Sequence, residues 1–178
     1  MPRDSFCNSC GARFANTERY PRTCEACGVQ VWANPIPVAV TLVPVSFGAR
    51  TGLLVVRRAI PPSGKLALVG GFVEEYESWQ ACAARELREE ANVSIDPTAL
   101  RPLWFASGEP RPDRILLFAV APTIAATALS PFEPNAEASE RGVIFGPGEA
   151  TDGLAFSLHT ETVRRYFGAS GSLEYERV

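Results

Sequence analysis

The chain has 178 residues, of which 46% are hydrophobic and 21% charged, with a formal net charge of −3, and this suits one soluble domain with a small appendage. The slight acidity argues against a nucleic-acid-binding surface over the whole protein, while a local basic patch stays compatible with it. No apolar run approaches the roughly 20 residues that span a bilayer, and the N-terminus lacks the apolar core of a signal peptide, so we expect a cytoplasmic protein without a membrane partner.

The first 34 residues are rich in cysteine and in turn-forming residues. Two Cys-x2-Cys pairs, Cys7 with Cys10 and Cys24 with Cys27, are separated by 13 residues, and a glycine follows each pair. In a reducing compartment such hooks favour a metal over disulfides. Four thiolates in a tetrahedral array suit a structural Zn²⁺, whereas a redox role, the alternative, is disfavoured because there are two hooks. We therefore predict a four-cysteine zinc ribbon over residues 1–34.

Residues 35–178 form the second predicted domain, after a linker at Asn34–Pro37, where proline disfavours a helix and cannot join a central ladder. Apolar runs bounded by glycine, proline or polar residues predict strands. These strands are Val38–Val45, Gly52–Arg57, Leu66–Val69 (stopped by Gly70-Gly71), Val93–Ile95, Trp104–Ser107, Ile115–Ala121 and Val143–Phe145. Helices are predicted over residues 79–91 and 157–167, and a surface excursion over residues 122–140. Strands interleaved with two helices predict an α/β sandwich.

The helix over residues 79–91, with Ser78 as its predicted N-cap, carries three glutamates close together. At about 100° per residue, Glu86, Glu89 and Glu90 fall within roughly one-third of the circumference. The apolar residues at helical spacing should face the core and leave the glutamate face outward; they are Ala84, Leu87 and Ala91. Like charges this close favour a divalent-metal site for a phosphate substrate, although a solvated acidic face is the alternative for the glutamates alone.

Residues 71–93 match the Nudix box, G-x5-E-x7-R-E-U-x-E-E-x-G-U, where U is aliphatic. The matching residues are Gly71, Glu77, Arg85, Glu86, Leu87, Glu89, Glu90 and Val93, and Asn92 replaces the second glycine. About residues 35–168 therefore resemble the Nudix hydrolases, which implies an α+β sandwich with a mixed sheet between helices. Asparagine adopts the left-handed conformation better than other non-glycine residues, so we expect the helix end to be preserved.

The resemblance implies a catalytic metal. Its ligands would be the backbone carbonyl of Gly70 and the carboxylates of Glu86, Glu89 and Glu90. Carboxylate oxygens suit Mg²⁺ or Mn²⁺, which polarise a diphosphate and lower the pKa of an attacking water. Arg85 and Glu77 resemble the internal ion pair that holds the box loop against the helix.

Many members of the family use another carboxylate, as a base or as an extra ligand. Glu137 and Glu140 are the candidates because they precede the strand at Val143–Phe145, with ordinary surface charge as the alternative. Other candidates are weaker. Stacking on an adenine ring is considered for Trp32, Trp104 and Phe105, with packing as the commoner outcome. Contact with phosphate or ribose is considered for Arg57, Arg58 and Arg111. His159, the only histidine, is assigned no catalytic role, and Cys82 is expected to be a packed small side chain.

A ribbon ahead of such a domain resembles the NADH pyrophosphatase group, yet the SQPWPFP-type signature of that group is absent from LWFASGEPRPDRILLF here. Ribbon-bearing relatives without the signature resemble ADP-ribose or FAD pyrophosphatases. The resemblance therefore implies hydrolysis of the pyrophosphate of a nucleoside diphosphate linked to another moiety, such as ADP-ribose, FAD or an NADH-like compound. The alternative is an RNA-cap or nucleic-acid-directed protein that binds through the ribbon. The resemblance also suggests a homodimer.

Overall fold

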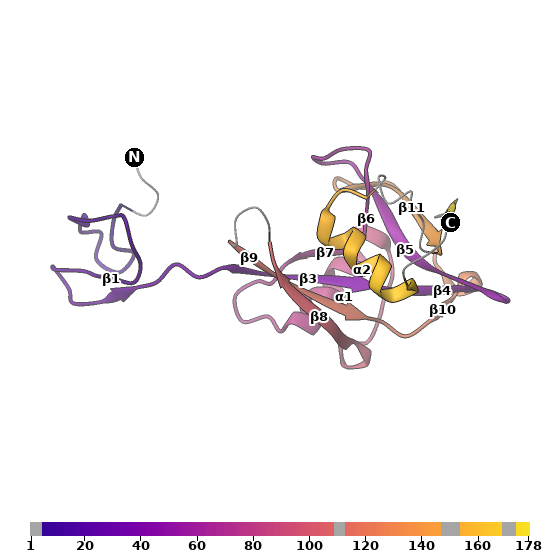
Figure 1. Ribbon diagram of the computed structural model, residues 1–178, viewed down its shortest axis with the longest axis horizontal. Helices are drawn as coiled ribbons and strands as arrows, with labels where there is room; N and C mark the ends of the chain where they lie inside the picture. Colours follow the sequence, from indigo (N-terminus) through magenta and orange to yellow (C-terminus); the bar gives the residue numbers. More distant parts are fainter. Residues whose placement is uncertain (1–4, 109–112, 147–153, 169–173) are drawn as a thin grey trace. The chain divides into compact units, whose positions relative to one another are not determined.

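The structure is a computed structural model that describes residues 5–108, 113–146, 154–168 and 174–178. The chain divides into two compact units, Met1–Pro35 and Ile36–Val178, which are described separately below (Figure 1). Within the described residues, no helix combines the length and the apolarity that crossing a bilayer requires.

The Met1–Pro35 unit is built around its cysteines. Two short strands, β1 (Arg22–Thr23) and β2 (Gln30–Val31), pair antiparallel. Its small core consists of Cys7, Phe14, Cys24 and Val31. The guanidinium of Arg22 stacks over the Tyr20 ring, 3.9 Å from its centroid. A core this small supplies little hydrophobic stabilisation, so a bound metal would contribute much of the folding free energy.

The Ile36–Val178 unit contains two sheets. The first has the order β7-β3-β9-β8. Its strands are β3 (Ile36–Leu42), β7 (Val69–Phe72), β8 (Arg101–Ser107) and β9 (Arg114–Val120). Strands β3 and β9 run parallel, while the other neighbours in this sheet run antiparallel.

The second sheet has the order β10-β4-β5-β11-β12, with β6 beside β5. Its strands are β4 (Pro44–Phe47), β5 (Arg50–Arg58), β6 (Leu66–Ala67), β10 (Ile124–Ala125), β11 (Ala138–Phe145) and β12 (Glu174–Arg177). Only the pair of β10 and β4 is parallel among the described strands of this sheet.

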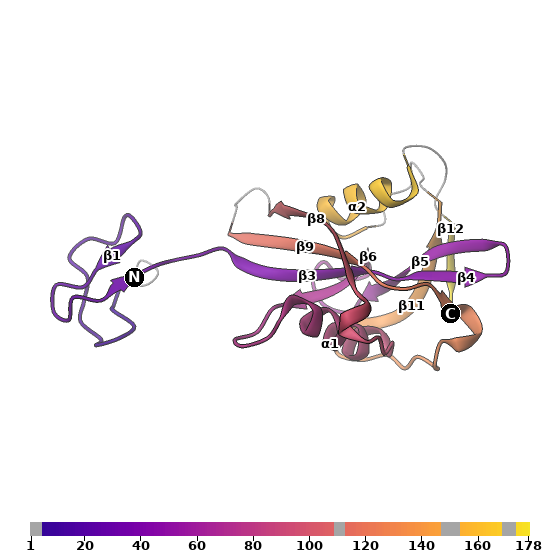
Figure 2. The ribbon, with the colours of Figure 1, turned by 90° about the horizontal axis from the view of Figure 1, so that it is seen from below.

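Two helices, α1 (Trp79–Ala91) and α2 (Ser157–Phe167), lie on opposite sides of the sheets (Figure 2). Short 3-10 turns, η1 (Pro97–Ala99) and η2 (Ala126–Ala128), complete the unit. Both faces of strand β5 are apolar. Leu54 packs in the hydrophobic cluster that includes residues of α1, and Leu53 packs in the hydrophobic cluster that includes residues of α2. Because successive side chains of a strand point to opposite faces, a run of apolar residues fills both layers. The expected sandwich with mixed strands between helices is confirmed.

Two predicted strands are each wrong as single strands. The run Val38–Val45 is divided between β3 and β4, and Leu66–Val69 between β6 and β7, in different sheets. Both parts of each run are buried, so hydrophobicity does not mark the crossing point. Nor does the glycine pair stop the third run: Gly70 lies inside β7, where a Cβ would lie 2.2 Å from the carbonyl oxygen of Ala39 on β3. This close approach of two backbones is why glycine is needed there.

Three further expectations need correction. Val93–Ile95 forms no strand, because it leaves the left-handed end of α1 and leads into η1, while both its apolar side chains pack into the core. The linker ends earlier than predicted, since β3 begins at Ile36 beside Arg114. Residues 122–140 are not wholly an excursion, because they contain β10 and the start of β11.

Candidate active site

Helix α1 carries the glutamates, and both of its ends are fixed by local hydrogen bonds. The hydroxyl of Ser78 accepts a hydrogen bond of 3.1 Å from the backbone N–H of Ala81, as an N-cap does. Asn92 has φ 51° and ψ 44°, and its backbone N–H donates to the carbonyls of Arg88 and Leu87. The left-handed C-terminus expected for this position is therefore confirmed.

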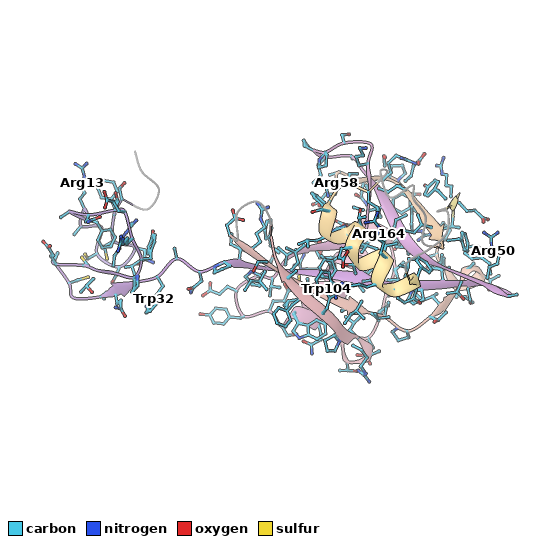
Figure 3. All side chains as sticks on the ribbon, viewed as in Figure 1. Arg13, Trp32, Arg50, Arg58, Trp104 and Arg164 are labelled. Carbon is cyan, nitrogen blue, oxygen red and sulfur yellow. The ribbon has the colours of Figure 1, made fainter. Side chains whose placement is uncertain are left out.

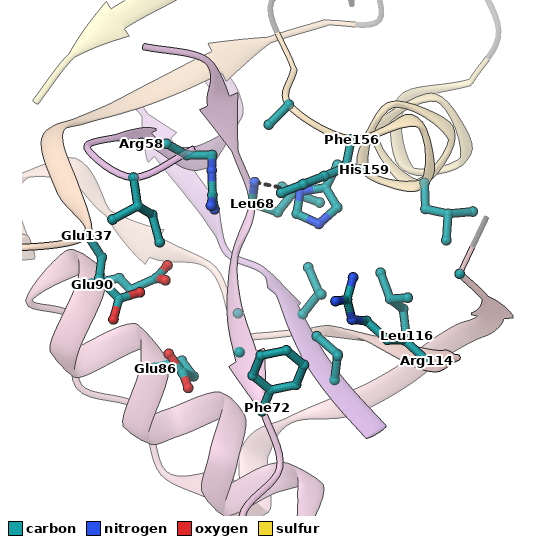
Figure 4. Close-up of a pocket in the computed structure, with 18 of the residues that line it drawn as sticks. Arg58, Leu68, Phe72, Glu86, Glu90, Arg114, Leu116, Glu137, Phe156 and His159 are labelled. Atoms are coloured by element: carbon teal, nitrogen blue, oxygen red, sulfur yellow. Dashed lines mark hydrogen bonds between the residues drawn. The ribbon is translucent and has the colours of Figure 1, made fainter. Parts of the chain in front are cut away.

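The glutamate face of α1 does not face outward as expected, because it forms one end of a pocket of about 990 Å³. Glu86 and Glu90 are only 9% and 8% exposed, whereas Glu89 is exposed. Gly70 and Glu137 line the same end, and Figure 4 shows Glu137 beside Glu90. Packing of α1 against β7 therefore places the acidic face of the helix in the wall of the pocket.

Arg85 joins the box loop to the helix. Its Nε and Nη2 donate to the two carboxylate oxygens of Glu77, both at 3.0 Å, and Nη2 also donates to the carbonyl of Phe72. Its Nη1 donates to Glu86 at 2.7 Å and to Glu89 at 3.2 Å. The guanidinium lowers the pKa of Glu77, and Glu77 in turn raises the pKa of Arg85 most strongly. Such a bidentate pair, with further acceptors in range, matches the fork geometry of arginine.

Gly71 lets the Glu86 carboxylate lie close to strand β7. A Cβ on Gly71 would lie 2.1 Å from Glu86 Oε1, so a larger residue would displace the carboxylate. Beneath it, the fully buried Cys82 places its Sγ 3.4 Å from the carbonyl oxygen of Phe72, which confirms a packed role for this thiol.

The carboxylates hold one another in an unfavourable electrostatic state. Burial, followed by the charges of Glu86 and Glu137, raises the pKa of Glu90 to about 8, and burial also raises the pKa of Glu86. Buried like charges cost free energy unless protons or cations neutralise them. The donor set consists of oxygens, the preferred ligands of Mg²⁺ and Mn²⁺, so the residues present fit such an ion.

The two extra-carboxylate candidates fall in different places. Glu137 lines the pocket next to Glu90. Glu140 is absent from the pocket lining and pairs with Arg57 at 2.7 Å, close to the hydroxyl of Tyr175. Arg57, a candidate for phosphate contact, is therefore occupied by this ion pair.

The rest of the pocket lining includes aromatic and cationic side chains (Figure 4). The Arg114 guanidinium lies 5.7 Å from the centroid of the Phe72 ring, and that of Arg58 lies 5.0 Å from the centroid of Phe156. His159 is buried there, where its Nδ1 accepts a 3.1 Å hydrogen bond from the Leu68 N–H. Burial and then Arg58 lower its pKa to about 3, so the ring is neutral at physiological pH.

The other aromatic and arginine candidates are distributed as follows. Trp104 packs flat on Phe118 with ring centroids 5.2 Å apart, and its Nε1 donates to Thr162 of α2, so it is a packing residue (Figure 3). Phe105 is exposed and does not line the pocket, and Trp32 is an exposed residue of the Met1–Pro35 unit. Arg111 lies outside the described residues.

The four N-terminal cysteines converge in the Met1–Pro35 unit. Their sulfurs all lie within 4.8 Å of one another, and none forms a disulfide. Each hook is closed by a backbone hydrogen bond from the following glycine, Gly11 to Cys7 and Gly28 to Cys24, and both glycines have a positive φ. Four convergent sulfurs are a donor set that can hold a metal ion, and all-sulfur tetrahedral sites are typical of structural zinc.

The family model of the NUDIX domain matches residues 35–163 of this chain. The chain belongs to the Nudix family. Among curated proteins, it is 37% identical over 114 residues to the NAD-capped RNA hydrolase NudC of Stutzerimonas stutzeri, an alignment that covers 63% of this chain and 38% of that protein. The chain thus spans less than half the length of this curated Nudix relative.

Solved Nudix structures share the fold. A NUDIX hydrolase from Nitrosomonas europaea aligns over 92% of this chain and 90% of its own, with a TM-score of 0.66 and 22% identity. The NUDIX domain of Shewanella oneidensis NrtR, solved with ADP ribose, aligns over 74% of this chain and 86% of its own, with a TM-score of 0.59 and 16% identity.

Some residues of the Nudix pocket escaped sequence reasoning. Phe72 follows the box glycine directly, and its position beside the box is a signal that could have drawn attention to it. Phe156, Arg114 and Leu116 carry no such signal, because they come from distant segments that only the fold brings together.

Proposed function

We propose that the Ile36–Val178 unit is a divalent-metal-dependent pyrophosphohydrolase whose substrate is a nucleoside diphosphate linked to another moiety. The observation that carries this proposal is the convergence of Glu86, Glu90 and Glu137 with Gly70 at one end of a single pocket. Burial raises the pKa of both Glu86 and Glu90, and the neighbouring charges of Glu86 and Glu137 add to the shift at Glu90, a cost that a bound cation would relieve.

The residues that would hold Mg²⁺ or Mn²⁺ are the carbonyl of Gly70 and the carboxylates of Glu86, Glu89 and Glu90. When bound, the ion would neutralise charge on the diphosphate and lower the pKa of a water. Arg85 and Glu77 would hold the box loop and orient the Glu86 carboxylate. We assign the extra carboxylate to Glu137 rather than to Glu140, since only Glu137 lines the pocket.

The aromatic and cationic part of the pocket lining suits the rest of such a substrate. Phe72 and Phe156 offer ring faces for a base or another flat group, and Arg58 and Arg114 offer positive charge for phosphates. The likeness to a protein named as an NAD-capped RNA hydrolase supports dinucleotide substrates that contain ADP. ADP-ribose and FAD rank slightly above NADH because the NADH signature is missing from the segment after the box.

A second candidate substrate is an RNA with a nucleotide cap, favoured by the activity for which the same relative is named. The four cysteines would hold Zn²⁺ and make the Met1–Pro35 unit a rigid module that can contact such a strand. Binding of single-stranded RNA would then be tight and would weaken steeply with salt.

The family resemblance also implies a homodimer. Light scattering on the purified protein in solution would test it by measuring the molar mass.

The test measures release of phosphate monoesters from a panel of NADH, NAD, ADP-ribose, FAD, nucleoside diphosphate sugars and NAD-capped RNA, with Mg²⁺ and with Mn²⁺. Glu89→Gln should abolish selective turnover, and Glu161→Gln, at a half-buried glutamate on α2 outside the pocket, is the matched control that should not. Glu137→Gln should lower turnover strongly and Glu140→Gln weakly. Absence of turnover on every substrate would refute the proposed activity.

A further inference from the structure

Asn135 links the helix that carries the glutamates to the segment that carries Glu137. Its Nδ2 donates to the backbone carbonyls of Glu89 and Glu90, at 3.1 and 3.3 Å. Its Oδ1 accepts from the backbone N–H groups of Glu137 and Ala138, at 3.0 and 2.8 Å. One planar amide thus uses its donor edge on α1 and its acceptor edge on the turn that enters β11.

These bonds complete the hydrogen bonding at the C-terminus of α1. The last four carbonyls of a helix have no partner within it. The carbonyl of Arg88 accepts from the N–H of Asn92, and that of Ala91 accepts from the guanidinium of the buried Arg141 at 2.8 Å. The carbonyls between them, on Glu89 and Glu90, are those that Asn135 satisfies. The backbone of two proposed metal ligands is therefore held by the same side chain that holds the backbone of Glu137.

We propose that Asn135 is a positioning residue that fixes the Glu137 carboxylate against Glu90 so that both can serve one divalent ion. This inference rests on the proposed function, because it assumes that the carboxylate end of the pocket binds Mg²⁺ or Mn²⁺. It adds to that function a residue outside the Nudix box that touches neither the metal nor the substrate.

The physical need for such a link is the repulsion between the carboxylates. Glu137 is exposed and lies in the bend just before β11, so its side chain can move away from Glu90 into solvent when the cation is absent. The bonds from Asn135 limit this freedom by tying both backbones together. Preorganised ligands lose less conformational freedom when the ion binds, which raises its affinity.

Removal of the Asn135 amide should loosen this geometry without unfolding the domain. The carbonyl of Glu137 still accepts a hydrogen bond of 2.7 Å from Ala59 N–H, and β11 still pairs with β5 from Ala138 onward. A matched control exists at the same helix end: the side chain of Asn92 donates to the carbonyl of Pro131, in the same loop but away from Glu137. Asn92→Gly removes that link and keeps a residue suited to the left-handed conformation.

The test is direct binding of Mn²⁺ to the full chain, followed by the electron paramagnetic resonance signal of the free ion, with no substrate present. We expect Asn135→Ala to weaken Mn²⁺ binding about tenfold, the lower end for loss of a residue that orients a ligand, and Asn92→Gly to leave it within twofold. Asn135→Asp keeps the shape and the acceptor edge of the side chain, loses the donors to the helix and adds a negative charge that by itself favours a cation. Weaker Mn²⁺ binding in this variant would therefore be due to loss of the hydrogen bonds to the helix. This variant also serves if Asn135→Ala does not fold.

A double-mutant cycle with Glu137→Gln separates positioning from a general loss of structure. If Asn135 acts through Glu137, Asn135→Ala should change Mn²⁺ affinity less than twofold once Glu137 is already glutamine. The proposal would be overturned if Asn135→Ala lowered Mn²⁺ affinity equally with Glu137 and with Gln at position 137. It would also be overturned if neither Asn135→Ala nor Glu137→Gln alone lowered Mn²⁺ affinity. Because these measurements need no substrate, an inactive protein that shows the expected Mn²⁺ pattern would refute the proposed activity and leave the role of Asn135 intact.

Discussion

Replacement of Arg85 by lysine should destabilise the Ile36–Val178 unit strongly, although it keeps the positive charge. Arg85 donates to both oxygens of Glu77, to Glu86, to Glu89 and to the Phe72 carbonyl. Lysine keeps the charge but presents three donors from one point, so it can reach only part of this set.

The magnitude follows from burial. The side chains of Arg85 and Glu77 are 20% and 15% exposed, so their charges are largely shielded from water. A hydrogen bond to a charged group contributes about 1.5–3 kcal/mol, and removal of one partner of a buried pair costs about 3–5 kcal/mol. Since lysine retains part of the set, we expect Arg85→Lys to lower the free energy of unfolding by about 3 kcal/mol.

The assay is urea unfolding at pH 7.5, followed by near-ultraviolet circular dichroism and by tryptophan fluorescence, and coincident curves from the two probes test for a single transition. The control is Arg88→Lys, a neighbour that is 61% exposed and reaches Glu89 only at 3.8 Å. The control should change the free energy of unfolding by less than about 0.5 kcal/mol. A loss for Arg85→Lys as small as that of the control would refute the view that the bidentate geometry, rather than the charge, holds the loop.

Three further perturbations test other parts of the structure. Gly71→Ala should displace the Glu86 carboxylate, which lies 2.1 Å from the added Cβ, so Mn²⁺ affinity should fall at least about tenfold while the melting temperature, measured by calorimetry, changes little. Burial lowers the pKa of His159 to about 3, so the folded protein binds a proton at this ring more weakly than the unfolded chain does. The stability that is present above pH 6.5 should therefore be lost as the pH falls toward 3, by up to roughly 1.4 kcal/mol per pH unit. Urea titrations of His159→Phe should lack this contribution. A zinc-selective chelator, or Cys24→Ser, should unfold the Met1–Pro35 unit, as measured by metal content and proteolysis, while the cooperative transition of Ile36–Val178 persists.

Local sequence chemistry predicted the parts of this protein that depend on neighbouring residues. Ser78 and Asn92 bound α1 as expected, because capping is decided within one helical turn. Each Cys-x2-Cys hook forms as expected because the backbone turn within it is local. Strand boundaries were harder to predict. Val43 and Leu68 lie where the chain crosses from one sheet to the other, yet both are buried, so the apolar run continues through each crossing.

The sequence by itself determined a Nudix box, its ion pair and a four-cysteine cluster, because each is a fixed spacing of residues on one short segment. The tertiary structure decided which way the glutamates face, which of Glu137 and Glu140 joins them, and that His159 and Phe156 line the same pocket. It also revealed Asn135, whose partners on α1 lie more than 40 residues away along the chain. The physical reason is that burial and long-range hydrogen bonds depend on the packing of distant strands and helices, which no local spacing records.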